Sequence, residues 1–159
     1  MSYYEHCRYR NFEGVVIVCA NFDDPDVIEL MNSEIPVVTI DYVHHNCTAV
    51  TSNNIQGMED LVKYIYSQGH RKIAYIHGQE GSSVTRDRLA SFYRTIDELG
   101  LEIPDTYVRS ADYLETKGSA KQTKELLNLE DPPTCIIYPD DTSLTVSYTH
   151  LTLPTKRIV

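Results

Sequence analysis

The stretch that decides the fold is Gly69-His70-Arg71-Lys72-Ile73-Ala74-Tyr75-Ile76-His77-Gly78, followed a short way on by Arg88-Leu89-Ala90-Ser91-Phe92. Its residue types predict the end of a helix, a buried strand, a polar loop and a helix that opens with an arginine. In parallel α/β sheets, small molecules bind at the loops that follow the strands. The stretch therefore indicates a ligand-binding α/β unit, and the alternative is an ordinary βαβ unit with a surface arginine.

Short apolar runs and amphipathic segments alternate along the rest of the chain. Continuous apolar runs are typical of strands buried on both faces of a sheet, and periodic ones are typical of helices with one buried face. The expected strands are 15–19, 37–41, 49–51, 72–77, 106–110 and 134–138, and the expected helices are 26–32, 54–68, 86–99 and 115–128. This alternation predicts the α/β class, with parallel sheets and right-handed crossovers.

Length and composition restrict the class of protein. A chain of 159 residues allows one domain or two small lobes, and 42% hydrophobic residues are enough to build a core. The 14 basic and 23 acidic residues give a net charge of −9, which argues against this chain gripping nucleic-acid phosphates by itself. No apolar run approaches the ~20 residues of a membrane span.

The N-terminal residues and the cysteines bear on the compartment. Residues 1–6 do not form a signal peptide. The four cysteines contain no CxxC pair, so we expect free thiols in a reducing, cytoplasmic environment.

The deciding stretch resembles the effector-binding core of the LacI/GalR family of bacterial transcription regulators. In that family a Gly-His-Arg-x-Ile-Ala strand start and an Arg-Leu-Ala-Gly-Phe helix recur at this spacing, and here Ser91 replaces the glycine. The resemblance covers about residues 11–144. It implies the periplasmic-binding-protein-like fold, with two lobes of parallel sheet and flanking helices around a ligand cleft.

The same resemblance implies that both lobes are incomplete. Residues 1–52 correspond to the second half of an N-terminal lobe, and residues 53–144 to a C-terminal lobe without its closing elements. The opening strand and helix of the first lobe, and the DNA-binding helix-turn-helix before them, have no counterpart. We therefore expect an internal fragment of the effector-binding domain.

The last fifteen residues depart from this pattern. Residues 146–155, Val-Ser-Tyr-Thr-His-Leu-Thr-Leu-Pro-Thr, are what the codons GTC TCT TAT ACA CAT CTG ACG CTG CCG ACG of a common transposase-type sequencing adapter encode. We therefore expect 145–159 to be an adapter artefact and exclude it from fold reasoning. The alternative is an unusual but genuine C-terminus.

Two residues of the second lobe are expected to contact the effector most directly. The resemblance places Arg88 where family members have an arginine that donates hydrogen bonds to ligand hydroxyls or carboxylates. This role suits a rigid planar guanidinium. Tyr113 falls where family members set an aromatic ring against a sugar or a base. The alternatives are a surface helix charge for Arg88 and a packing side chain at a strand end for Tyr113.

Other polar positions complete the expected site. Asp140 and Asp141 resemble an Asn-Asp pair of the family, whose first member contacts ligand and whose second caps the next helix. An aspartate at 140 only accepts hydrogen bonds, which favours hydroxyl-rich or cationic ligands. Ser83, with Ser82 and Thr85, either contacts ligand or caps the helix. Asn53, at the lobe crossover, is the expected hinge.

Motifs for other chemistries are missing. The chain has no GxGxxG after a strand, GxxxxGK[ST], GxSxG or HExxH motif, so we expect neither an enzyme nor a cofactor. His44-His45 lacks a third ligand nearby and predicts a solvated loop rather than a metal site. A catalytic or metal role for the carboxylates of Asp140 and Asp141 is disfavoured, because adjacent residues on one loop rarely converge.

Taken together, these observations and the resemblance imply the effector-sensing domain of a LacI-type regulator. The effector would be a small molecule such as a carbohydrate. The intact protein would be a homodimer, and it would bind operator DNA only through the missing helix-turn-helix. Ligand binding would shift the populations of two states. A periplasmic sugar-binding protein of a transport system and a small-molecule enzyme with a doubly wound sheet are the alternatives.

Overall fold

The computed structural model describes residues 1–18 and 21–152, with side chains as far as Thr149. The chain divides into two compact units, which meet in sequence between Asn53 and Asn54. Each unit contains one parallel three-stranded sheet.

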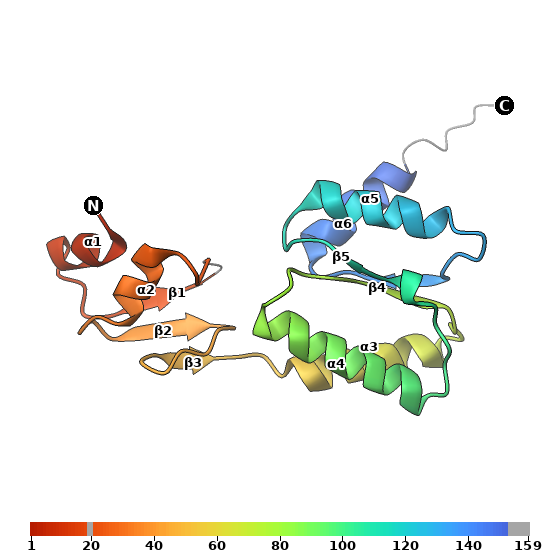
Figure 1. Ribbon diagram of the computed structural model, residues 1–159, viewed down its shortest axis with the longest axis horizontal. Helices are drawn as coiled ribbons and strands as arrows, with labels where there is room; N and C mark the ends of the chain where they lie inside the picture. The colour runs from red at the N-terminus through yellow and green to blue at the C-terminus, as the bar shows by residue number, and fades with distance from the viewer. Residues whose placement is uncertain (19–20, 153–159) are drawn as a thin grey trace. The chain divides into compact units, whose positions relative to one another are not determined.

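The first unit packs two helices on one face of its sheet (Figure 1). The strands, in the order β1-β2-β3, are β1 (Val15–Ile17), β2 (Val37–Ile40) and β3 (Thr48–Val50), and the helices are α1 (Tyr3–Tyr9) and α2 (Pro25–Met31). Both strand pairs are parallel.

Local signals explain where these two helices begin. Ser2 and Glu5 form a reciprocal capping box at the start of α1. The Asp24 side chain caps α2 by accepting from the Asp26 N–H, and Pro25 follows at the first helical position, where a missing N–H costs nothing. The buried faces of the two helices then meet Ile17 and Val37 of the sheet.

The opposite face of this sheet carries apolar side chains that the described chain does not cover. Val16 in β1 is 61% exposed and Val50 in β3 is 55% exposed. Parallel sheets are normally covered on both faces. Among the described residues, helices therefore cover only one face of this sheet.

The second unit has helices on both faces of its sheet. The strands, in the order β5-β4-β6, are β4 (Ile73–His77), β5 (Val108–Ser110) and β6 (Cys135–Ile137). In Figure 1, α3 (Asn54–Ser67) and α4 (Ser83–Glu98) lie on one side of the sheet, and α5 (Thr116–Leu127) and α6 (Asp141–Thr152) lie on the other. All pairings are parallel, which confirms the predicted architecture.

The central strand β4 is buried along its whole length. Ile73 and Tyr75 pack with α3 and α4, in a cluster that includes Phe92. Ala74 and Ile76 point to the other face and pack with Leu126 of α5. The continuous apolar run of the sequence therefore reflects burial on both faces of the sheet.

Several element boundaries differ from the prediction. Helix α4 begins at Ser83, three residues before the expected start and two residues after Gly81, whose φ is +91°. The strand expected at 106–110 begins only at Val108, because Asp105–Tyr107 form a 3-10 turn in which the Tyr107 N–H bonds to the Pro104 carbonyl. Cys19, expected at the end of a strand, lies outside the described residues.

The last helix extends into the segment expected to be adapter-derived. Helix α6 runs to Thr152 and packs on α5. Its buried positions are Ser143 and Ser147, whereas Leu144 and Tyr148 are exposed. This distribution is the reverse of the amphipathic pattern that normally seats a helix on its neighbours.

Candidate ligand-binding site

The predicted site residues of the second unit follow its three parallel strands. Arg88 lies on α4 after β4, Tyr113 in the loop after β5, and Asp140 in the loop after β6. Because the carboxyl ends of parallel strands lie at the same edge of a sheet, these residues share the edge where α/β folds bind ligands.

Arg88 is held by two acceptors from distant parts of the chain. Its Nε donates to Asn54 Oδ1 at 2.8 Å, and its Nη1 donates to the Pro139 carbonyl at 3.2 Å. Asn54 is the buried first residue of α3, and Pro139 follows β6. These contacts fix the guanidinium plane while Nη2 keeps further donors, so the arginine is pre-oriented for an acceptor.

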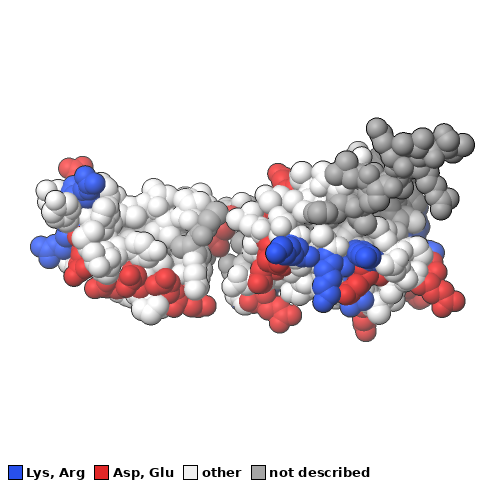
Figure 2. All heavy atoms as spheres, turned by 90° about the horizontal axis from the view of Figure 1, so that it is seen from above, with Lys and Arg blue, Asp and Glu red and all other residues white. Residues whose placement is uncertain are grey.

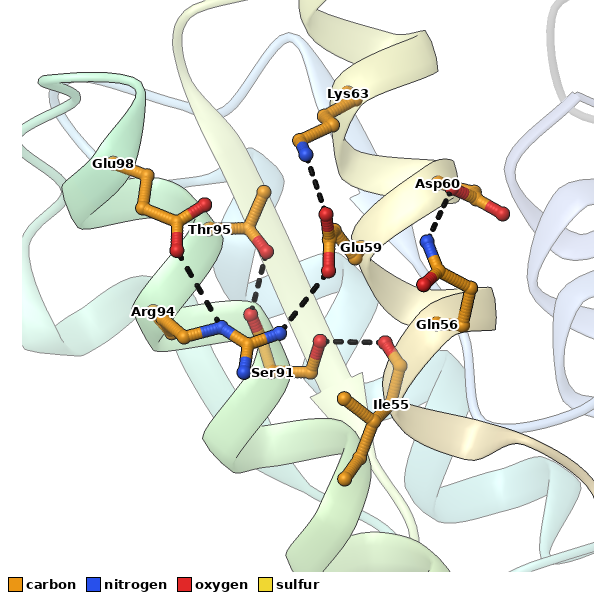
Figure 3. A network of polar contacts seen from close by, with 9 residues as sticks. All are labelled: Ile55, Gln56, Glu59, Asp60, Lys63, Ser91, Arg94, Thr95 and Glu98. Atoms are coloured by element: carbon orange, nitrogen blue, oxygen red, sulfur yellow. Dashed lines mark hydrogen bonds and ion pairs between the residues drawn. The ribbon is translucent and has the colours of Figure 1, made fainter.

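A polar network joins α3 to α4 and thereby sets the position of the helix that carries Arg88 (Figure 3). Glu59 accepts from Lys63 within α3 and from Arg94 of α4, the latter at 3.1 Å, and Arg94 also lies 3.6 Å from Glu98. The hydrogen bond from Lys63 is the main reason that the pKa of Glu59 is lowered. The network lies at the helix surface, where ion pairs contribute little to the free energy of unfolding.

Ser91 adds a direct hydrogen bond between the same two helices. Its hydroxyl is buried and donates to the Ile55 carbonyl at 2.7 Å (Figure 3). One turn later, the Thr95 hydroxyl donates to the Ser91 carbonyl at 2.8 Å. The serine that replaces the family's glycine therefore faces α3 and links it to α4.

The Tyr113 ring packs closely against Gly78 at the end of β4. A Cβ placed on Gly78 would come within 2.2 Å of the Tyr113 ring, so only glycine admits this contact. The Tyr113 hydroxyl is 2.9 Å from the hydroxyl of the buried Thr85. The ring is therefore held in a defined position next to Arg88's helix.

Asp140 caps helix α6 and also ties down the neighbouring loop. Its Oδ1 accepts from the Ser143 N–H at 2.8 Å, and its Oδ2 accepts from the Leu114 N–H and the Ser143 hydroxyl, both at 3.0 Å. Burial acts to raise the pKa of this carboxyl, but the hydrogen bonds outweigh burial and the pKa is lowered.

This arrangement corrects the expected division of roles between the two aspartates. Asp141, expected to be the cap, is instead the exposed first residue of α6. The strand ends at Ile137, and the cap falls on the last non-helical residue before the helix, which is Asp140. Most of the acceptor capacity of Asp140 is thereby already used.

The remaining predicted residues lie at the ends of helices. Ser83 is the first residue of α4 and half-buried, and the side chain of Ser82 makes no capping hydrogen bond in the described structure. Capping by the Ser82 hydroxyl is therefore not observed, and Thr85 bonds Tyr113 instead. Asn53 is the exposed last residue of the first unit. Its role as a hinge stays a prediction.

Sequence reasoning missed what Asn54 and Tyr75 contribute to the site. The sequence predicts Thr85 as a cap or a ligand contact, but it indicates neither the hydrogen bond of Asn54 to Arg88 nor that of Thr85 to Tyr113. Tyr75 is 1% exposed, and its hydroxyl finds no hydrogen-bond partner among the described residues. Burial raises the pKa of Tyr75, with Tyr113 adding to the shift and the Arg88 charge opposing it. The hydroxyl is therefore protonated and able to donate.

Other chemistries find little support in the described residues. Within residues 1–18 and 21–152, no three histidine, cysteine or acidic side chains gather in a way that could hold a metal ion. The His44 and His45 ring centroids lie 4.3 Å apart, and His44 Nδ1 also accepts from the Asn46 N–H at 3.3 Å and lies 3.8 Å from Cys47 Sγ. In the same part of the chain, no helix has both the length and the apolar character to cross a membrane.

Charge is distributed differently on the two units. In the view of Figure 2, acidic side chains predominate on the first unit, and both signs mix on the second. An extended basic face suited to a nucleic-acid backbone is not visible in that view. This agrees with the excess of acidic residues in the sequence.

Comparison with known proteins identifies relatives of this arrangement. The family model described as periplasmic binding proteins and sugar binding domain of LacI family matches residues 1–154. The HTH-type transcriptional repressor PurR of Aliivibrio salmonicida (strain LFI1238) is 24% identical over 135 residues, covering 83% of this chain and 40% of PurR. Catabolite control protein A of Priestia megaterium is 26% identical over 135 residues, with the same coverage of 83% and 40%.

Solved structures agree on the fold. A regulatory protein of the LacI family from Chloroflexus aggregans superimposes with a TM-score of 0.76 at 25% identity, covering 96% of this chain and 56% of that protein. A LacI transcriptional regulator from a Rhodococcus species gives a TM-score of 0.79 at 22% identity, with 98% and 57% covered.

The chain spans about two fifths of the length of the curated relatives. Of these two, PurR is named as a transcriptional repressor. The chain belongs to the family of periplasmic binding proteins and sugar-binding domains of the LacI family.

Proposed function

We propose that this chain is the effector-sensing part of a LacI-type transcription regulator, which binds a small molecule at the carboxyl edge of the β5-β4-β6 sheet. Arg88 supplies the main polar contact, because Asn54 and Pro139 hold its guanidinium in place and leave donors unused. This pre-orientation of a charged donor at a ligand-binding edge is the observation that carries the proposal.

The other site residues have graded roles in this proposal. Tyr113 offers a ring face, held by Thr85, for the apolar side of a ligand such as a carbohydrate. Asp140, whose carboxylate already accepts from Leu114 and Ser143, makes a weaker contact with a ligand hydroxyl. Ser83 contributes a polar contact from the start of α4, and Asn53 acts as the hinge between the two units.

The regulatory output belongs to the whole protein. Ligand binding shifts the population between two conformations of a homodimer, and a DNA-binding domain outside this chain reads that shift at operator DNA. The curated relatives include transcriptional repressors, which favours this function over sugar binding for transport and over catalysis. The intact regulator works in the cytoplasm.

A thermal-shift screen of the 159-residue chain tests this function. Sugars, sugar derivatives, nucleobases and amino acids are added to the unaltered chain and to the Arg88→Ala and Arg86→Ala variants. Arg86 is the matched control, because it lies on the same helix with a side chain 75% exposed. We expect a ligand that stabilises the unaltered chain and Arg86→Ala but not Arg88→Ala. A ligand that stabilises all three equally would remove Arg88 from the site, and turnover lost on Arg88→Ala would favour an enzyme.

We also propose that residues 145–159 derive from a sequencing adapter. The codon correspondence supports this, and so does the exposure of Tyr148 on a helix turn that buries Ser147. Sequencing the source locus across the codon for residue 145 tests it. A locus that continues with the codons for these fifteen residues would show that they are native.

A further inference from the structure

The Tyr75 hydroxyl is a buried hydrogen-bond donor without an acceptor among the described residues. Tyr75 is 1% exposed, and its hydroxyl has no hydrogen-bond partner among the described residues. A buried hydroxyl without a partner costs folding free energy. Phenylalanine would fit the same apolar surroundings without that cost. We therefore expect the hydroxyl to bind a partner outside the described residues.

The position of this hydroxyl associates it with the candidate site. Tyr75 points from β4 toward α4, where its ring packs 5.2 Å from the ring of Phe92. Thr85, Arg88 and Phe92 recur at helical spacing and so lie on the same side of α4. Burial raises the pKa of Tyr75, and the Arg88 charge acts against that rise. The unpaired hydroxyl therefore lies between the sheet and the side of α4 that carries Arg88.

The groups that remain available there are mainly donors. Arg88 keeps the N–H groups of Nη2, and the protonated Tyr75 hydroxyl adds one more donor. The carboxylate of Asp140 already accepts from two N–H groups and one hydroxyl, which offset its charge. Donors gathered around a fixed positive charge suit an acceptor that is itself negatively charged.

We propose that Tyr75 and Arg88 together bind an oxyanion of the effector, either a carboxylate or a phosphate. This inference rests on the proposed function and narrows its ligand class to anionic compounds. It also corrects the sequence-based expectation that Asp140 favours hydroxyl-rich or cationic ligands, because the carboxylate is engaged within the chain. The Tyr75 hydroxyl then determines specificity, because it increases the affinity for an anionic ligand over that for its neutral analogue.

The test compares three six-carbon probes that differ in charge: glucose, glucose 6-phosphate and gluconate. Their binding to the 159-residue chain is measured by titration calorimetry, together with the Tyr75→Phe and Tyr64→Phe variants. Tyr64 is the matched control, because it lies on α3 and is 62% exposed. The phosphate and carboxylate probes distinguish the two sources of the oxyanion.

We expect at least one charged probe to bind more tightly than glucose, and Tyr75→Phe to weaken that binding about tenfold, the scale of one hydrogen bond to a charged group. Tyr64→Phe should leave it unchanged. Absence of binding by both charged probes, or equal binding to Tyr75→Phe, overturns the inference. Tight binding of glucose alone overturns it while the proposed function stands.

A second readout is independent of any ligand. If the hydroxyl is unpaired, Tyr75→Phe raises the melting temperature, because a buried polar group without a partner is removed. A lower melting temperature would mean that the hydroxyl already has a partner in the folded chain, and this would overturn the premise.

Discussion

The cap at the start of α6 offers a sharp test of the site's architecture. In Asp140→Ala, the Ser143 N–H and hydroxyl lose their acceptor, and so does the Leu114 N–H. Loss of a helix cap costs about 1 kcal/mol, and a hydrogen bond to a charged group contributes about 1.5 kcal/mol. We therefore expect the free energy of unfolding to fall by about 2 kcal/mol.

Urea unfolding followed by circular dichroism measures this loss. The midpoint should fall with an unchanged m-value, and the melting temperature should fall by about 4–8 °C. Asp141→Ala is the matched control. Asp141 is exposed at the first position of the helix, so its loss should cost less than about 0.5 kcal/mol. A larger effect of Asp141→Ala than of Asp140→Ala would refute the assignment of the cap.

The pH dependence of this effect has a defined sign. In the folded chain, hydrogen bonds lower the pKa of Asp140 below its ordinary value of 3.8. A lowered pKa in the folded state stabilises the fold above the unfolded pKa, and this contribution is lost as pH falls through the folded value. The stability difference between the unaltered chain and Asp140→Asn should therefore be constant above pH 5 and shrink only below pH about 4. A difference that shrinks between pH 7 and 5 would contradict this account.

The other predictions concern packing contacts and hydrogen bonds elsewhere in the second unit. Gly78→Ala should lower the free energy of unfolding by about 1–3 kcal/mol, because its methyl group would overlap the Tyr113 ring. The double variant Gly78→Ala, Tyr113→Ala should recover part of this loss in urea unfolding, and no recovery would contradict the overlap. Ser91→Ala should cost about 1 kcal/mol through the lost bond to the Ile55 carbonyl, and an unchanged midpoint in chemical denaturation would show that this bond does not stabilise the helix pair. Tyr107→Phe should cost a similar amount, about 1 kcal/mol, because the buried Tyr107 hydroxyl donates to the Asp131 carbonyl; equal melting temperatures for both proteins in calorimetry would argue against it.

Much of the fold was predictable because its signals are local. The run from Ile73 to Ile76 is apolar without alternation, and the strand that it forms is buried on both faces. Gly69 and Gly100 both adopt positive φ values and lie two residues after the ends of α3 and α4, where glycine is the favoured terminator. Elements whose ends carry such signals were placed to within a few residues.

Details of the site were less predictable, because they depend on contacts between distant segments. Asn54 lies far from Arg88 in the sequence, and periodicity says nothing about the hydrogen bond that joins them. Asp140 and Asp141 are equally able to cap a helix, and only the position of the last non-helical residue decides between them. The burial of Tyr75 followed from the pattern of β4, but its unpaired hydroxyl did not.

The central claim is that Arg88 holds a small-molecule effector through its fixed guanidinium. Titration calorimetry of the ligand identified in the thermal-shift screen, with the unaltered chain and with Arg88→Lys, tests it most directly. Lysine keeps the charge but lacks the planar fork that Asn54 and Pro139 orient. The account predicts binding at least about tenfold weaker for Arg88→Lys. An unchanged dissociation constant would contradict it.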